Sequence, residues 1–169
     1  MIKRCCFTGH RLKSLPWGDR EEDRRCRDLK GRLRREIRRL YQEEGVVWFL
    51  SGMAQGVDTW AAEAVLEARR IWPDIVLECA IPYPGQAALW DRKAQARYAA
   101  IVTQCDCQTV LCQHYAQDCF FLRNRYMVDA SQFVVAVWNG APGGTGYTVN
   151  YARRQRRQVI LLPPVLGAK

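Results

Sequence analysis

Short apolar runs alternate with longer segments of helical spacing along the chain, and this alternation restricts the possible folds more than any other feature. Two continuous apolar runs, residues 46–50 and 133–138, are typical of strands that are buried on both faces. Residues 22–44 instead place apolar side chains three and four positions apart, as an amphipathic helix does. Strands and helices in alternation predict an α/β fold, with a doubly wound, mainly parallel sheet flanked by helices.

Turn residues and helix-ending signals give the remaining boundaries. Gly45 is expected to end the first helix, and Pro73 with Asp74 to end the second. No internal repeat or linker interrupts the pattern, so residues 1–169 are expected to form a single domain. We expect strands at residues 2–8, 46–50, 75–81, 109–112, 133–138 and 159–162, and helices at residues 22–44, 56–72, 89–103, 119–130 and 147–157.

Targeting signals and the placement of cysteine bear on the compartment. The chain has no apolar run of transmembrane length and begins without the apolar core of a signal peptide, so we expect a cytoplasmic protein with no membrane partner. Reduced thiols are expected there, and Cys5, Cys6, Cys79 and Cys112 fall in apolar, strand-like runs. We expect no metal site, because the spacing of the one Cys and His cluster matches no paired zinc motif; it comprises Cys105, Cys107, Cys112, His114 and Cys119.

Positive charge is concentrated near the two ends of the chain. The net charge is +9, and residues 1–44 hold fourteen of the 26 lysines and arginines. A second basic run comprises Arg153, Arg154, Arg156 and Arg157. We interpret these runs first as solvated helix faces, and keep nucleic-acid binding as the alternative.

The segments that follow the predicted strands contain the candidate binding residues. Ligands of open parallel sheets bind outside the carboxyl ends of the strands. Glycine and short polar residues there suit a phosphate, because they allow close backbone approach and free N–H donors, although glycine also marks ordinary turns. The candidates are Thr8, Gly9, His10 and Arg11 after the first strand, Ser51, Gly52, Met53, Gly56 and Asp58 after the second, and Asn139, Gly143, Gly144 and Thr145 after the fifth.

Each candidate has an expected role and a plainer alternative. Gly52, Gly56, Gly143, Gly144 and Thr145 are expected to hold phosphate, although Thr145 also suits a helix cap. Arg11 would add charge as a clamp on the phosphate, or be an ordinary surface arginine. Asp58 would contact a sugar or base, or simply favour its helix dipole.

Further side chains are expected at the rim of the same pocket. Arg123 and Asn124 lie near the start of the helix that precedes the fifth strand, from where they would reach the rim. One of Trp17, Trp60, Tyr83 and Trp90 would stack on a base, although core packing explains most of them. The chain shows no Ser-His-Asp order, paired catalytic carboxylates or Walker lysine motif, which favours an anion-binding protein over a hydrolase.

Together these motifs resemble the YpsA-like family of the SLOG superfamily. The similarity is carried by Thr8-Gly9-His10-Arg11, by the most specific stretch at residues 51–58, by Arg123 and Asn124 with Asp129, and by Trp138-Asn139-Gly140 with Gly143-Gly144-Thr145. It covers nearly the whole chain and implies a Rossmann-like sheet in a bacterial protein. It also implies a pocket for a nucleotide or a derivative such as ADP-ribose or NAD, with no cofactor required, and a homo-oligomer. Members are linked to cell division and stress behaviour in Gram-positive bacteria.

Two branches of that superfamily supply alternative functions. The LOG phosphoribohydrolases carry a Pro-Gly-Gly-x-Gly-Thr-x-x-Glu motif that residues 142–146 resemble, but Tyr147 replaces its threonine and Asn150 its catalytic glutamate. N-glycosidic cleavage would then lack the carboxylate that stabilises an oxocarbenium-like transition state. DprA proteins bind single-stranded DNA, yet the basic residues here lie largely on one helix, with few interleaved aromatics. Binding or sensing of a nucleotide-like ligand is therefore our first interpretation.

Overall fold

A computed structural model describes residues 1–167 of the chain, which form one parallel six-stranded sheet flanked by five α-helices. The strand order is β4-β3-β2-β1-β5-β6, and every neighbouring pair runs parallel. The expected Rossmann-like α/β fold is thereby confirmed. The elements are β1 (Lys3–Gly9), α1 (Arg24–Arg39), β2 (Val46–Ser51), α2 (Val57–Ile71), β3 (Val76–Ile81), α3 (Arg92–Gln104), β4 (Cys107–Val110), α4 (Cys119–Asp129), β5 (Phe133–Val137), α5 (Gly144–Arg154) and β6 (Gln158–Leu162).

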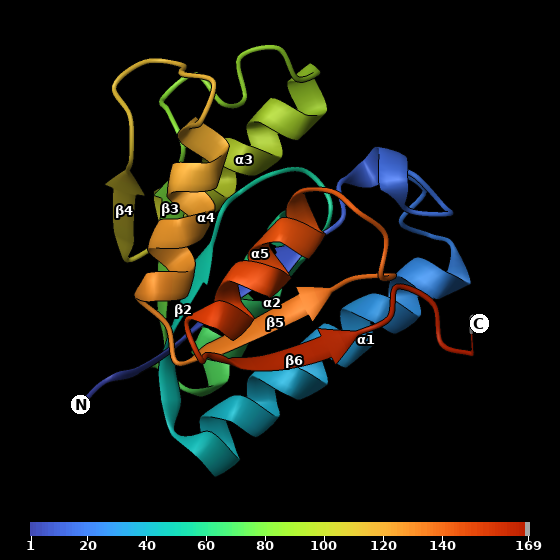
Figure 1. The fold of residues 1–169 in the computed structure, drawn as a ribbon. Helices are drawn as coiled ribbons and strands as arrows, with labels where there is room; N and C mark the ends of the chain where they lie inside the picture. Colours follow the sequence, from blue (N-terminus) through green and yellow to red (C-terminus); the bar gives the residue numbers. More distant parts are fainter. Residues whose placement is uncertain (168–169) are drawn as a thin grey trace.

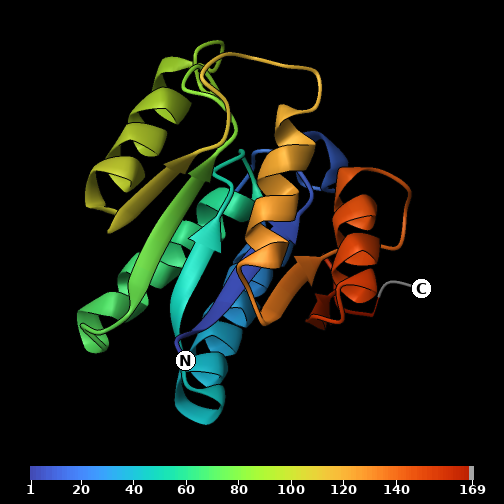
Figure 2. The same ribbon diagram turned by 60° about the vertical axis from the view of Figure 1, so that its left-hand side comes forward.

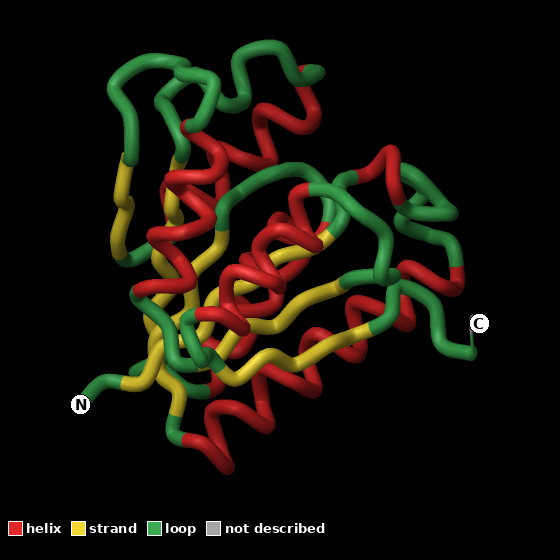
Figure 3. Tube along the Cα trace, in the orientation of Figure 1, coloured by secondary structure: helices red, strands yellow, loops and turns green. Residues whose placement is uncertain are grey.

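The helices form two layers, with α4 and α5 on one face of the sheet and α1, α2 and α3 on the other (Figures 1 and 2). The chain moves outward from β1 through β2 and β3 to β4, then returns through α4 to β5 on the other side of β1. Right-handed crossovers place the helices of these two halves on opposite faces (Figure 3). The strand order therefore reverses between β1 and β5, and a crevice opens outside their carboxyl ends.

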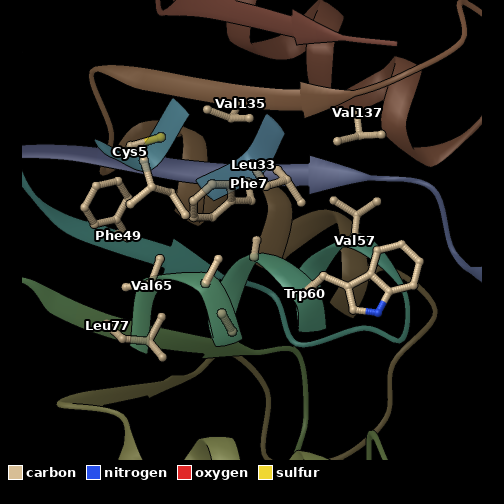
Figure 4. Packing of buried hydrophobic residues seen from close by; sticks show 14 of the residues in the cluster. Cys5, Phe7, Leu33, Phe49, Val57, Trp60, Val65, Leu77, Val135 and Val137 are labelled. Carbon is tan, nitrogen blue, oxygen red and sulfur yellow. The ribbon is translucent and has the colours of Figure 1, made fainter. Parts of the chain in front are cut away.

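Alternate residues of the central strands enter two separate apolar layers. Phe7 and Phe49 face α1 and α2, with their rings stacked 6.1 Å apart (Figure 4). Cys6 and Leu50, their neighbours along the strands, face α4 and α5 instead. Burial on both faces explains why these strands read as continuous apolar runs.

The first helix ends at the predicted Gly45, and the structure adds an N-terminal cap that was not predicted from the sequence. Asp23 caps α1 by accepting a hydrogen bond from the Arg25 N–H at 2.9 Å. A π-helical turn over Leu40–Glu44 extends the helix to Gly45, whose φ of 73° is the left-handed geometry of a C-cap. The helix predicted over residues 22–44 is thus present, with a wider last turn.

Several predicted boundaries were wrong by two or three residues, including the start of α1 at Arg24 and the end of α5 at Arg154. Helix α3 begins at Arg92 rather than residue 89, because Asp91 caps it by accepting from the Ala94 N–H at 2.8 Å. Strand β4 begins and ends two residues earlier than predicted, because its backbone pairing with β3 determines where it starts and stops. Cys112 therefore lies outside the strand and is partly exposed. Helix α5 begins at Gly144 rather than residue 147, so part of the glycine-rich turn is helical.

Two further features concern the cysteines and the membrane. The eight cysteines all lie within residues 1–167 and form no disulfide there. Over the same residues, no cluster of three or more His, Cys, Asp and Glu side chains is arranged to hold a metal ion. None of the helices in this part of the chain has the length and apolar character needed to cross a membrane.

Candidate functional site

The crevice at the strand reversal is a cavity of about 700 Å³. Its walls come from the end of β1, the loop after β5, the start of α5, the helix α4 and the segment that leads into α2. Eleven of the fifteen candidate residues line it: Thr8, Gly9, His10, Arg11, Asp58, Arg123, Asn124, Asn139, Gly143, Gly144 and Thr145. The fold thus gathers side chains from segments that are more than a hundred residues apart.

The amino end of α5 opens into this cavity. Gly143 is the N-cap residue, and no side chain in the described chain caps the helix. The first backbone N–H groups of a helix lack partners within the helix and carry its positive dipole end, which suits an anion. Thr145 lies inside the first turn, so its expected alternative role as a cap is wrong, and the residue lines the cavity.

Arg123 is the most unusual charged residue of the site, because it is buried, with 3% of its surface exposed. Its Nη1 donates to the carbonyl oxygen of Gly52, and its Nε donates to Asn124 Oδ1 at 2.8 Å. Burial lowers the pKa of the guanidinium, while the nearby charge of Asp58 opposes that shift. Arg123 was predicted to reach the rim of the pocket. In the structure it is a buried residue that forms part of the cavity wall.

Asp58 is the acidic residue among the described residues that line the cavity. One of its carboxylate oxygens accepts a hydrogen bond from the Ala54 N–H at 3.2 Å. Burial raises the pKa of this carboxyl, whereas the charge of Arg123, the Ala54 hydrogen bond and the charge of Arg11 lower it. Asp58 therefore holds its own loop and also presents polar atoms to the cavity.

Two more cations make the site attractive to anions. Arg11 is exposed at the mouth, with its guanidinium carbon 4.9 Å from the centre of the Phe120 ring. Lys13 lines the same mouth. With Arg123, they outnumber the one carboxylate of Asp58, so the cavity carries a net positive charge.

His10 connects the loops that follow β1 and β5. Its Nε2 accepts a hydrogen bond from the backbone N–H of Asn139 at 3.2 Å. Burial lowers the pKa of this histidine below its ordinary value of 6.5, although its contact with Asn139 opposes the shift. Neutral His10 thus positions the loop that carries the glycine-rich turn.

The other four candidates, Ser51, Gly52, Met53 and Gly56, lie behind the cavity wall. Ser51 Oγ accepts from the Met53 N–H at 3.2 Å and donates to the Asp58 carbonyl at 2.8 Å. Gly56 has a φ of 96°, and a Cβ there would lie 2.9 Å from the carbonyl oxygen of His10. The Met53 and Ala54 N–H groups donate to side chains of the protein, and the Gly52 carbonyl accepts from Arg123. These four residues therefore support Asp58 and Arg123 rather than lining the cavity themselves.

The aromatic residues at the site were not predicted from the sequence. Within the described chain, Trp17, Trp60, Tyr83 and Trp90 all lie outside the main cavity, and the first two are core residues whose rings are 6.3 Å apart. Phe120 and Phe121 line it instead. A usable signal was present, because Phe120 precedes the candidate Arg123 by three residues and so shares its helix face.

Asn150 has no place in the cavity as the structure describes it. It lies on α5 and is exposed to solvent. The position that carries glutamate in the LOG motif therefore offers no carboxylate to a ligand held by the glycine-rich turn.

Comparison with known proteins finds relatives that share the sequence pattern over most of the chain. The family described as "YspA SLOG family" matches residues 5–160. A UPF0398 protein of Halalkalibacterium halodurans is 29% identical over 119 residues, which cover 69% of this chain and 63% of that protein. One from Brevibacillus brevis is 33% identical over 106 residues, which cover 63% of this chain and 55% of that protein. The chain thus spans less than two thirds of either relative.

Two solved structures share the fold at low sequence identity. DNA processing protein A (DprA) from Streptococcus pneumoniae superposes with a TM-score of 0.66 and 17% identity, over 98% of this chain and 52% of that one. The protein of the same name from Helicobacter pylori, whose structure is described as revealing a unique single-stranded DNA binding mode, gives a TM-score of 0.68 and 18% identity, over 99% of this chain and 68% of that one.

Proposed function

Because the chain belongs to the YspA SLOG family, we propose that its cavity binds the phosphate of a nucleotide or nucleotide-derived ligand, in a binding or sensing role. The observation that carries this proposal is the uncapped amino end of α5, which opens into a cavity flanked by Arg11 and Arg123. A helix N-terminus and two guanidinium groups attract the same ligand, an anion with several oxygen atoms. ADP-ribose and NAD are the compounds that we would test first.

Each group has a separate part in binding. The N–H groups at the start of α5 and the Thr145 hydroxyl donate to phosphate oxygens, and Arg11 closes over them from the mouth. Arg123 contributes a charge that is fixed in place by Gly52 and Asn124, so little side-chain entropy is lost on binding. Asp58 is the acceptor available for a ribose hydroxyl group.

The test is a calorimetric and thermal-shift titration with ATP, AMP, NAD, ADP-ribose and a cyclic dinucleotide, using the wild type and Gly144→Val. A Cβ at Gly144 meets no described atom within 4 Å, so the variant is expected to fold. Its side chain projects where the phosphate would lie, and ligand affinity should fall at least tenfold. A ligand that binds the folded state raises the melting temperature of the wild type by mass action.

A matched control is Asn150→Ala, which changes an exposed residue on the same helix, and it should bind as the wild type does. Unchanged affinity of a folded Gly144→Val protein would contradict the assignment of the phosphate site. Analysis of the titrated ligand afterwards shows whether it was consumed, which separates sensing from hydrolysis.

Single-stranded DNA is a second candidate, and the outer face of α4 and α5 favours it. Besides the buried Arg123, residues 119–157 contain five arginines and one acidic residue, Asp129. The Phe121 and Tyr147 rings lie 4.8 Å apart, and the Arg125 guanidinium is 5.5 Å from the Tyr151 ring. Phe121 also lines the cavity, so the phosphate site and this face are continuous. Arginines interleaved with aromatic rings are typical of single-strand binding.

The arginine-rich helix α1 has a weaker claim to the same ligand. Residues 19–44 hold ten lysines and arginines but also eight acidic residues. Several of these arginines are paired: Arg25 with Asp23, Arg32 with Asp28, and Arg39 with Glu36. Nucleic-acid binding, expected from the sequence to involve α1, is therefore better supported on α4 and α5.

Oligonucleotide titrations at two salt concentrations test this second candidate. Arg125→Gln and Tyr151→Leu should weaken binding, whereas Arg34→Gln and Arg38→Gln on α1 serve as controls and should not. Loss of phosphate contacts also reduces the salt dependence of the affinity. Affinity that is indifferent to salt would argue against DNA binding.

A further inference from the structure

A row of aromatic and arginine side chains leads away from the main cavity over α4 and α5. It begins at Phe121, which lines the cavity, is 44% exposed, and has its ring 4.8 Å from that of Tyr147. The two helices lie side by side on one face of the sheet, so the row crosses from one to the other (Figure 2). We call these residues the aromatic row; in order they are Phe121, Tyr147, Arg125, Tyr151 and Arg154.

Contacts between neighbours hold the aromatic row together. Arg125 Nε donates to the Tyr147 hydroxyl at 2.8 Å, and the guanidinium carbon of Arg125 is 5.5 Å from the centre of the Tyr151 ring. The guanidinium carbon of Arg154 is 5.9 Å from the same ring. The Tyr151 hydroxyl donates to Asp129 at 2.8 Å, which fixes the ring further. Aromatic rings with arginines between them suit the stacked bases of a single strand.

The charge of the main cavity, where the row begins, suits the end of a strand. Arg11, Lys13 and Arg123 line the cavity against the single carboxylate of Asp58, which leaves two positive charges in excess. A phosphate inside a strand carries one negative charge. A terminal phosphate carries about −1.5 to −2 at pH 7 and has three acceptor oxygen atoms. The terminal phosphate therefore matches the cavity better.

Arg123 has a donor available for such a phosphate. Its Nη1 and Nε donate to the Gly52 carbonyl and to Asn124 Oδ1, but no group within residues 1–167 accepts from Nη2. Nη2 is also not one of the unpaired side-chain atoms of this range that are sealed from solvent, and the residue lines the cavity. A ligand in the cavity can therefore reach a donor that is already held in place.

The direction of the row favours one end of a strand over its middle. The cavity meets α5 at its amino end, and Tyr147 and Arg154 lie progressively further along that helix. Seven residues of helix span roughly 10 Å, which is the length of about three stacked nucleotides. A strand held by an internal phosphate needs a path on both sides of the cavity, whereas a strand held by its end needs only one.

We propose that the main cavity holds the terminal phosphate of a single-stranded oligonucleotide, whose next bases stack along the aromatic row. This inference rests on the proposed function, because it uses the same phosphate site and extends it from a free nucleotide to the end of a strand. A 5′-phosphate and a 3′-phosphate share the chemistry that the cavity recognises, so both are tested.

The experiment is a calorimetric titration of the wild type with five ligands. Three are thymidine hexanucleotides that carry a 5′-phosphate, a 3′-phosphate or neither, and two are thymidine 5′- and 3′-monophosphate. One phosphorylated strand should bind at least tenfold more tightly than the unphosphorylated strand, because only a terminal phosphate supplies the second charge. It should also bind at least tenfold more tightly than its matching mononucleotide, because stacked bases add to the affinity.

Two variants separate the cavity from the row. Gly144→Val obstructs the phosphate position, so it should remove the difference between phosphorylated and unphosphorylated strands. Tyr151→Leu should weaken all three strands about tenfold and leave the mononucleotides unaffected, because Tyr151 does not line the cavity as the structure describes it. Tyr41→Leu is the matched control: Tyr41 packs 4.9 Å from Trp72 beside α1, on the other face of the sheet, and no affinity should change.

The outcomes separate this inference from the proposed function. Equal affinity of the wild type for the three strands overturns the inference, and bound mononucleotides would leave the phosphate site intact. Equal affinity for a phosphorylated strand and its mononucleotide also overturns it, because the row then contributes nothing. If none of the five ligands binds, the inference is wrong, and the titrations with ADP-ribose and NAD decide the proposed function separately. These comparisons use the wild type, so they hold even where a substitution prevents folding.

Discussion

Gly52→Ala is expected to destabilise the protein through Arg123 alone. A Cβ at this position would lie 2.5 Å from Arg123 Nη1 and 2.7 Å from its guanidinium carbon. The backbone of Gly52 is not in the left-handed region, so alanine itself is not strained there. The guanidinium has to move, yet it is buried and is held by the carbonyl of Gly52 itself.

The magnitude follows from the contact that is lost. A hydrogen bond to a charged group contributes roughly 1.5–3 kcal/mol, and displacement of the guanidinium removes one such bond. A loss of about 2 kcal/mol corresponds to a melting temperature about 4–8 °C lower for a chain of this size. Ligand affinity should fall as well, because Arg123 lines the main cavity.

Thermal unfolding of a double-mutant cycle provides the assay. In an Arg123→Ala background the added Cβ meets no guanidinium, so Gly52→Ala should cost less than half as much as in the wild type. Gly31→Ala is the control: it lies in α1 with its nearest contact at 3.6 Å, and it should raise stability by about 0.5–1 kcal/mol. Equal costs of Gly52→Ala in the two backgrounds would refute the reasoning.

Three further predictions concern pH and a helix end. The Arg97 hydrogen bond lowers the pKa of Glu21 from 4.5 to about 2. The stabilisation of the fold by this ion pair is therefore complete above pH 4.5 and is lost as the pH falls towards 2. In urea titrations, the difference in the free energy of unfolding between the wild type and Arg97→Gln should shrink over that pH range. Burial lowers the pKa of His10, so its bond to Asn139 is present above pH 6.5 and lost at lower pH. The free energy of unfolding should therefore fall between pH 7.5 and 5.5, and chemical denaturation should show a smaller fall in His10→Gln; an unchanged pH profile would exclude His10 as the cause. Gly45→Ala places alanine at a φ of 73°, where its Cβ meets nothing within 4 Å, so the cost is one of backbone conformation alone. Chemical denaturation should show a free energy of unfolding lower by about 1 kcal/mol, and a smaller loss for Gly45→Asn.

The sequence by itself determined the order and type of the elements. Apolar runs such as residues 133–138 have few structures open to them other than buried strands, and the spacing in residues 22–44 favours one amphipathic helix. These signals are local, because the side chains that produce them are neighbours along the chain. The rule that ligands bind at the carboxyl ends of parallel strands then located nine of the cavity-lining residues, and the start of the helix before the fifth strand supplied Arg123 and Asn124.

Only the tertiary structure decided which of the glycine-rich turns lines the main cavity. The turns at residues 51–56 and 139–146 look alike in sequence. In the first, however, the Met53 and Ala54 N–H groups donate to Ser51 and Asp58, whereas most glycines in the second turn line the main cavity. The burial of Arg123 depends in the same way on Gly52, which lies tens of residues away. Contacts between distant segments follow from packing of the whole sheet and its helices, and no local pattern encodes them.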